Sequence, residues 1–344
     1  MLPPQKGFRK SKNINDVTNN IRTKLDSLTE QNLSGFLMSV NFRSAFDSIS
    51  FDYIPKMLKL FGFSNEFIKI ISNYLIGGKA TINLENGNFT QFFDIEQGIG
   101  QGLPLSVLIF ILSIEPLIIK IVHTNNLKKL EWEGWGEADR TEAFADDMSV
   151  FTHFDLEDIR NLTTILDTFG RISNLKLNKA KTSIAAINRE ASTAISNDIE
   201  AIGYKLEKNS IIILGHHITT TRLDNCTTEV NLNWKKVINS IHLVSFKIKM
   251  LKLPLLQTVK ALKNFLLAKL SYISATTTCP KLYANTIENV VINTINAAGY
   301  KFSREYIFNQ NNGLGFPDIS IFCNALLTST FVKVRKNKEF WTKK

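Results

Sequence analysis

The chain has 344 residues, of which 44% are hydrophobic, and a formal net charge of +10. This length can bury a large core in two or three subdomains, and the basic excess fits a polyanionic partner such as nucleic acid. Three cysteines, far apart and without a CxxC pair, argue against a zinc knuckle or a disulfide framework and suggest free thiols in a reducing compartment.

The chain begins with a polar, basic segment over residues 1–20. It lacks the apolar stretch of a signal peptide. We expect a helix over residues 15–28, where apolar side chains recur every three or four positions. A buried strand is expected at 36–40, and helices are expected at 53–60 and 65–75.

A hairpin is predicted next. Strands at 80–85 and 89–95 flank Asn86-Gly87, the strongest short-range hairpin signal in the chain. A glycine-rich turn at 98–102 then leads into a helix that starts near 104, where proline suits the first turn.

The apolar run over residues 103–122 has two interpretations. It is long enough to span a membrane, but it contains Glu115, Pro116 and Lys120. A helix that is apolar on nearly all sides can also be the core helix of a large domain. We favour the core helix.

The most unusual stretch of the sequence is Phe144-Ala145-Asp146-Asp147. Predicted strands at 141–144 and 148–151 place the two acids at a tight hairpin turn. Adjacent carboxylates repel each other, and a divalent cation such as Mg²⁺ removes that cost. Taken alone, an Asp-Asp pair is more often a solvated turn, so its neighbours must decide.

The second half of the sequence changes character. A helix is expected at 156–172, strands at 182–187 and 211–214, and mostly helix after 230. No Asp or Glu occurs between Val230 and Ile287. Acid-free basic helices suit a phosphate backbone, although an ordinary solvated face is the alternative. The lysines of this stretch are Lys235, Lys236, Lys247, Lys249, Lys252, Lys260, Lys263, Lys269 and Lys281.

Five motifs, taken in chain order, resemble those of a known family. They are Asn41-Phe42-Arg43-Ser44-Ala45-Phe46-Asp47, the turn Gln97 to Ser106, the Phe-Ala-Asp-Asp hairpin, Leu175 to Thr182, and Leu214-Gly215. In this order and spacing, the chain resembles the palm of a reverse transcriptase of the non-LTR retrotransposon (LINE-type) group. Residues 313–318 resemble the segment downstream of the thumb in that group.

The resemblance implies an α+β fold. It would be a right-hand polymerase palm, with an antiparallel sheet packed on helices, followed by a helical thumb. We expect a residual fingers segment at 1–35, the palm at 36–222, the thumb at 223–300 and a post-thumb segment at 301–344.

The resemblance also implies catalytic roles. Asp146 and Asp147 match the family's metal-binding carboxylates, for Mg²⁺ or Mn²⁺. Asn41 stands where the family has a third aspartate, and an amide cannot bridge two cations comparably. We expect this loss to slow phosphoryl transfer on the order of 10³-fold or more. Asp47 lies past the strand, and we do not expect it to substitute.

Further positions match binding residues of the family. The nucleotide-binding matches are Phe46, Gln101, Gly102 and Lys181. The template- and primer-binding matches are Arg9, Lys10, Pro104, Ser106, Leu214, Gly215, Lys235, Lys236, Lys260 and Lys263. Singly, each has a bland alternative: a core phenylalanine, a plain helix-entry turn, a strand end or a solvated basic residue.

Several features depart from the family pattern. Basic residues are usual at the positions of Gln97 and Gly100, and proline at that of Val107. The sequence shows no upstream finger elements that bind the triphosphate. It also shows no endonuclease, no RNase H-like domain and no zinc knuckle. The expected partners are an RNA template, a DNA primer and deoxynucleoside triphosphates, without membrane or zinc.

Two functional hypotheses follow. One is an RNA-directed DNA polymerase, a nucleotidyltransferase impaired by Asn41 and by missing fingers. The alternative is a non-catalytic nucleic-acid-binding remnant of such a polymerase.

Overall fold

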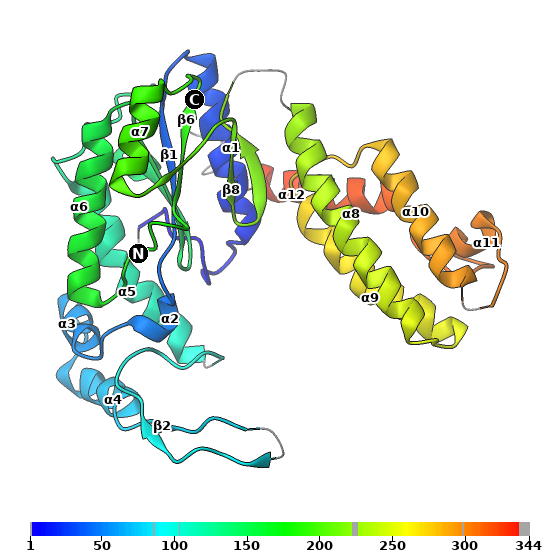
Figure 1. Ribbon diagram of the computed structural model, residues 1–344, viewed down its shortest axis with the longest axis horizontal. Coiled ribbons are helices and arrows are strands. Elements are labelled where there is room, and N and C mark those ends of the chain that lie inside the picture. Colours follow the sequence, from blue (N-terminus) through cyan, green and yellow to red (C-terminus); the bar gives the residue numbers. More distant parts are fainter. Residues whose placement is uncertain (1, 85–86, 103, 222–225, 298, 337–344) are drawn as a thin grey trace. The chain divides into compact units, whose positions relative to one another are not determined.

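The computed structural model describes residues 2–84, 87–102, 104–221, 226–297 and 299–336 (Figure 1). The chain divides into two compact units, Met1–Leu214 and Gly215–Lys344. The division falls in the turn between strands β8 (Ser210–Ile213) and β9 (His216–Thr219). The boundary expected after residue 222 lies outside the described residues, so the palm and thumb limits stay predictions.

The first unit is built on a five-stranded sheet of order β4-β5-β1-β6-β7. All its neighbouring strands are antiparallel except β6 and β7, which are parallel. This antiparallel-rich sheet, packed on helices, confirms the predicted α+β class. The strands are β1 (Gly35–Val40), β4 (Thr141–Phe144), β5 (Asp147–His153), β6 (Ser183–Ile187) and β7 (Lys205–Glu207).

One face of this sheet is covered by helices. Alternate residues of the central strand, Phe36, Met38 and Val40, belong to one core cluster with side chains from three helices. The helices are α3 (Tyr53–Leu60), α5 (Pro104–His123) and α6 (Leu156–Ser173). Because side chains alternate along a strand, the odd-numbered residues of β1 face away from these helices.

Helix α5 explains the long apolar run of the sequence. It alone, among the described residues, is long and apolar enough to cross a membrane, and 61% of its apolar window is buried inside the protein. It contacts α3, α6 and β4. Its all-round apolar surface is therefore that of a core helix.

The predicted helices of the first unit agree closely with the structure. Helix α1 (Ile14–Glu30) begins at a capping box formed by Asn13 and Asp16. Helices α3 and α4 (Asn65–Leu75) have the predicted limits. The prediction did not include α2 (Ala45–Ser48), η2 (Glu137–Arg140), α7 (Thr193–Ile202), β7 and β9.

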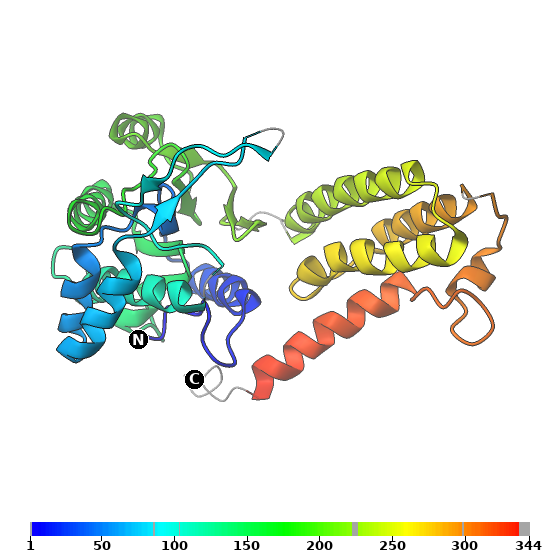
Figure 2. The same cartoon turned by 90° about the horizontal axis from the view of Figure 1, so that it is seen from below.

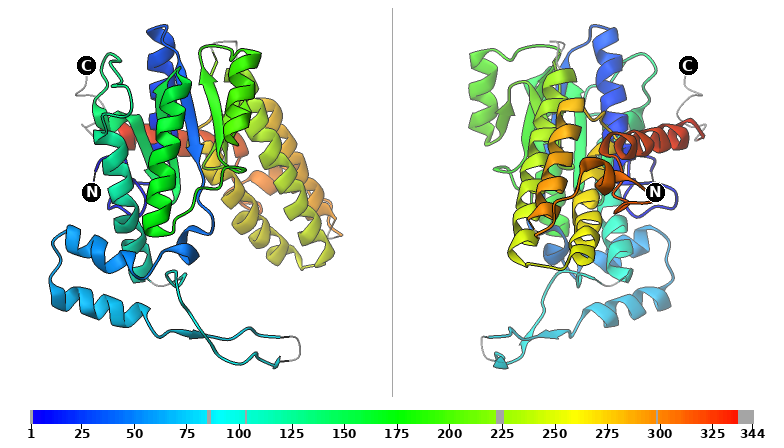
Figure 3. Two further views of the ribbon diagram at one scale, coloured as in Figure 1. Left: turned by 60° about the vertical axis from the view of Figure 1, so that its left-hand side comes forward. Right: turned by 90° about the vertical axis from the view of Figure 1, so that its right-hand side faces the viewer.

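The prediction of a long hairpin with paired strands at 80–85 and 89–95 is largely wrong. Only β2 (Lys79–Ala80) and β3 (Phe93–Asp94) pair as strands, with an isolated bridge between Asn83 and Phe89. Figure 3 shows this arm extending beyond α4. Most of its described side chains are exposed, so neither face is packed and a regular ladder has no support. The expected tip residue Asn86 lies outside the described residues.

The second unit is helical after β9. Helices α8, α9 and α10 contact one another, and α12 contacts α9 and α10. Figure 2 shows the arrangement of these four helices from below. They share a core that includes Trp234, Leu266, Ile287 and Phe316. The helices are α8 (Cys226–Met250), α9 (Leu255–Ser274), α10 (Lys281–Asn296), the short α11 (Arg304–Phe308) and α12 (Ile319–Lys336).

Candidate functional site

The Asp-Asp hairpin lies beside the end of the central strand. The antiparallel register of β1 with β5 pairs Val40 with Met148, so its next step places Asn41 opposite Asp147. Residues directly opposite in such a pair point to the same sheet face. Both therefore lie on the face away from α5 and α6. Two positions separated by more than one hundred residues in sequence meet at one edge.

The turn itself consists of Ala145 and Asp146, because Phe144 pairs with Asp147. Ala145 has a φ of 55°, in the left-handed region that residues with a Cβ rarely adopt. Such strain persists only where surrounding contacts hold it, and it clusters at functional sites.

The two carboxylates influence each other electrostatically. Burial, and then the neighbouring charge of Asp146, raises the pKa of Asp147 to about 6. The Asp147 residue as a whole is exposed, so solvent screens part of this effect. A divalent cation at this tip would relieve the repulsion.

The Leu175 to Thr182 motif flanks Asn41 on its other side. Asn178 N donates to Asn41 O over 2.7 Å. Asn41 N in turn donates to the Thr182 hydroxyl over 3.1 Å. An isolated bridge pairs Phe42 with Leu177. The exposed Lys181 lies in the turn between Asn178 and Thr182, so the chain brings it close to position 41.

The glycine-rich turn is fastened to helix α2. Gln101 Nε2 donates to both carboxylate oxygens of Asp47, over 3.0 and 3.3 Å. A Cβ on Gly98 would lie 2.7 Å from Asp47 O, and its φ is 89°, so this close approach requires glycine. The adjacent Phe46 is half-buried and stacks on Phe110, with ring centroids 4.3 Å apart.

Other predicted binding residues of the first unit vary in exposure. Gly102 and Lys10 are exposed, whereas Ser106 is buried with its hydroxyl unpaired among the described residues. The Arg9 guanidinium donates to Leu2 O and Gln5 O, each over 3.0 Å, which closes its own loop. The Pro104 side chain lies outside the described part of the structure.

In the second unit, the lysines divide into two groups. Lys236 donates to Gly215 O and Lys263 to Leu314 O, each over 3.2 Å, so both have structural contacts. Lys235 and Lys260 are exposed. The hairpin turn Leu214-Gly215 has φ values of 50° and 80°.

The oxygen donors at the tip of the Asp-Asp hairpin form an incomplete site for a hard cation. No group of three His, Cys, Asp or Glu residues able to hold a metal occurs within the described ranges. The tip offers Asp146 and Asp147, with the amide of Asn41 opposite. Oxygen donors of this kind suit Mg²⁺ or Mn²⁺, but the set carries one negative charge fewer than three carboxylates would.

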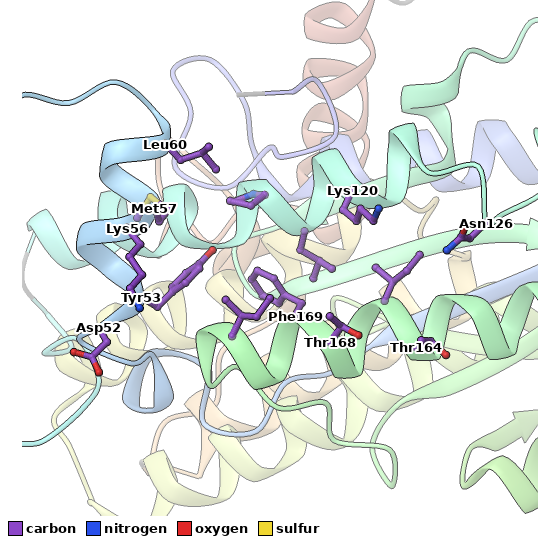
Figure 4. A pocket seen from close by; sticks show the side chains of 14 residues that line it. Asp52, Tyr53, Lys56, Met57, Leu60, Lys120, Asn126, Thr164, Thr168 and Phe169 are labelled. Atoms are coloured by element: carbon purple, nitrogen blue, oxygen red, sulfur yellow. The ribbon is translucent and has the colours of Figure 1, made fainter.

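A separate cavity of about 570 Å³ lies among α3, α5 and α6 (Figure 4). Apolar side chains such as Met57, Leu117 and Phe169 line it, with Lys56 and Lys120 also present. None of the predicted catalytic or binding residues lines this cavity, so it is distinct from the site at the Asp-Asp hairpin.

Sequence reasoning missed one residue that touches the hairpin turn. The side chain of Gln5 is buried and hydrogen-bonds to Ala145. A lone glutamine in a polar, basic segment gives no signal for this contact. Only folding brings together residues that lie 140 positions apart.

Known proteins share sequence similarity with part of this chain. Residues 1–218 match the family described as reverse transcriptase (RNA-dependent DNA polymerase). The chain is 27% identical over 181 residues to a retrovirus-related Pol polyprotein from type-1 retrotransposable element R2 of Popillia japonica, covering 52% of this chain and 25% of that protein.

A second curated relative, from a type-2 retrotransposable element of Drosophila melanogaster, is 27% identical over 183 residues, covering 52% of this chain and 16% of that protein. The chain thus spans a quarter or less of the length of these relatives. Among solved structures, an apo telomerase of Candida tropicalis aligns with a TM-score of 0.45 and 16% identity, covering 64% of this chain and 40% of that one.

Proposed function

The chain belongs to the reverse transcriptase (RNA-dependent DNA polymerase) family, and from this premise we propose that its first unit is a nucleotidyl-transfer domain with a weakened metal site. It is a reverse transcriptase domain of the non-LTR (LINE-type) retrotransposon group, as its similarity to two retrotransposable-element polyproteins supports. Its substrates would be an RNA template, a DNA primer and deoxynucleoside triphosphates.

The proposed mechanism assigns each residue a task. Asp146 and Asp147 would hold divalent cations that activate the primer 3′-hydroxyl and stabilise the leaving pyrophosphate. Phe46, braced by Phe110, would lie under the incoming sugar and exclude a 2′-hydroxyl. Lys181 would neutralise charge on the triphosphate.

The glycine-rich turn would support the nucleotide indirectly. Gln101 would set the position of α2 through Asp47, and Gly102 would let the backbone approach the substrate. In the second unit, the exposed Lys235 and Lys260 would follow the phosphate backbone of the template–primer duplex.

The register that places Asn41 opposite Asp147 carries this proposal. Residue 41 stands at the position from which a third carboxylate would complete the site. Its amide offers an oxygen but no charge. Transition-state neutralisation should therefore fall by several kcal/mol, or on the order of 10³-fold in rate.

Primer extension tests the proposal directly. The purified chain is given an annealed RNA template and DNA primer, the four deoxynucleoside triphosphates, and Mg²⁺ or Mn²⁺. We expect little or no extension from the chain as it stands, and partial extension from Asn41→Asp. The double variant Asn41→Asp with Asp146→Asn is the matched control, and it should be inactive.

A second candidate function is favoured by the same residue. Since Asn41 weakens the metal site, the chain could act as a non-catalytic nucleic-acid-binding protein. If the unmodified chain and the Asn41→Asp variant both bind the template–primer duplex and neither extends it, this alternative is supported. Strong extension by the unmodified chain would refute the role given to Asn41.

A further inference from the structure

The side chain of Gln5 makes three hydrogen bonds inside the first unit. It is completely buried. Its Nε2 donates to Ala145 O over 3.2 Å, and its Oε1 accepts from Ala145 N over 3.0 Å. The same oxygen accepts from Gly7 N over 2.8 Å. One side-chain amide therefore pairs with both backbone groups of a single turn residue.

These hydrogen bonds satisfy backbone groups of the turn that lack a partner strand. A residue inside a two-residue hairpin turn has no partner strand for its N–H and C=O. Ala145 is buried, and a buried backbone group without a partner is costly. Gln5 satisfies both groups, and so it holds the left-handed conformation of Ala145 directly before Asp146.

The backbone around Gln5 reinforces the contact. Ala143 N donates to Pro4 O over 3.0 Å, and Lys6 N donates to Ala143 O over 2.8 Å. Gln5 thus forms a parallel bridge with Ala143 of strand β4. The segment Pro4–Gly7 lies along the edge of the sheet, which fixes the distance from Gln5 to the turn.

Two residues near Gln5, Gly7 and Phe8, also contact the hairpin. A Cβ added to Gly7 would lie 2.4 Å from Ala145 N, so only glycine allows the approach. The ring of Phe8 lies against that of Phe144, with centroids 6.2 Å apart. Contacts from the segment therefore reach both the turn residue and the strand end that precedes it.

We propose that Gln5 is a positioning residue for the carboxylates of Asp146 and Asp147, acting through the backbone of Ala145. Gln5 touches no reacting atom itself. It limits the motion of the peptide units that carry the two acids, so that both can face one cation together. This inference rests on the proposed function in assigning the acids to metal binding, but the contact is independent of it.

The test compares Gln5→Met with Asn20→Ala. Methionine keeps the length of the side chain and loses all three hydrogen bonds. Asn20 is the matched control, because its amide donates to Glu142 of the same strand β4, over 3.2 and 3.3 Å, without touching the turn. Both changes are made in the Asn41→Asp protein, which has the fuller set of charges.

Two measurements are made on each variant. Amide hydrogen exchange, followed by NMR, reports on Ala145, Asp146 and Asp147, with Val150 as the internal reference in strand β5. Mn²⁺ titration, followed by electron paramagnetic resonance, reports on the metal site. We expect Gln5→Met to speed exchange at the three turn residues at least tenfold more than at Val150, and to weaken Mn²⁺ binding about threefold to tenfold. Asn20→Ala should do neither.

Different outcomes separate this inference from the proposed function. Uniform acceleration at the turn and at Val150 would mean that Gln5 only stabilises the fold, and the inference would fail. It would also fail if the turn loosened while Mn²⁺ affinity stayed within twofold. If the Asn41→Asp protein binds no Mn²⁺, the proposed function fails, and the exchange data alone decide whether Gln5 positions the turn.

Discussion

The hydroxyl of Thr182 accepts a hydrogen bond of 3.1 Å from the backbone N–H of Asn41. Thr182 is fully buried. Its backbone N–H is itself bonded to Asn178 O, and Asn178 N is bonded to Asn41 O. The backbone of position 41 is thus held from the side opposite Asp147, independently of which side chain it carries.

Replacing Thr182 by the isosteric valine should destabilise the first unit by about 1–3 kcal/mol, because the Asn41 N–H would lose its partner. Chemical denaturation measures this change. Thr141→Val is the matched control: Thr141 is also fully buried, but its hydroxyl has no hydrogen-bond partner among the described residues. That variant should be neutral or slightly stabilising. Equal losses in both variants would contradict the assigned role of Thr182.

The raised pKa of Asp147 predicts a pH dependence in the absence of metal. In the folded state its pKa is about 6, against a usual value of 3.8, so the folded protein binds this proton more tightly. The stabilisation is therefore present below about pH 4 and is lost as the pH rises through 6. Solvent screening at this exposed residue limits its size to about 1 kcal/mol.

The change that tests this linkage is Asp147→Asn. With a chelator present, the variant should gain thermal stability over the unmodified chain above pH 6, and the gain should shrink toward pH 4. Melting temperatures measured in parallel across this range give the difference curve. A flat difference curve for Asp147→Asn would show that its pKa is not raised.

The stacked pair of Phe46 and Phe110 predicts sugar selectivity. In the Asn41→Asp protein, Phe46→Val should raise ribonucleotide incorporation relative to deoxyribonucleotide incorporation by at least tenfold, because it removes the ring that we propose to exclude the 2′-hydroxyl. Single-nucleotide extension measures the ratio. Phe110→Leu keeps that ring but removes its support, so its effect should be smaller. Unchanged selectivity in Phe46→Val would remove Phe46 from the nucleotide site.

The two groups of lysines predict different effects on nucleic-acid binding. Lys235→Gln with Lys260→Gln should lower the slope of log affinity against log salt by about 2, since each phosphate contact contributes about 0.9. Lys263→Gln should instead reduce stability, because its ammonium group donates to Leu314 O. Fluorescence anisotropy with a labelled template–primer duplex measures the slopes. Lys59→Gln, on α3 of the first unit, should leave the slope unchanged.

Local patterns in the sequence predicted much of the fold. Helices α3 and α4 have their predicted limits because their apolar residues repeat with a helical period. The Asp-Asp hairpin was predicted because short apolar strands flank the acids. Its proximity to Asn41 followed from the family resemblance rather than from any local pattern.

Other features depend on packing that the sequence does not reveal. The Asn-Gly signal was strong, yet the arm forms little regular sheet because most of its described side chains are exposed. Gln5 was overlooked because its partner, Ala145, lies far along the chain. The bond of Gln101 to Asp47 likewise joins separate segments, and no local pattern indicated that this side chain holds a helix.

The position of β1 at the centre of the sheet also has a consequence for how the protein is made. Its two neighbours, β5 and β6, leave the ribosome more than one hundred residues later. Until then, the backbone hydrogen-bonding groups on both sides of this apolar segment have no partner strand in the nascent chain. The segment can then pair with a wrong strand or aggregate. Synthesis of this protein should therefore depend on chaperones, and slower translation should not help β1 until β5 has emerged.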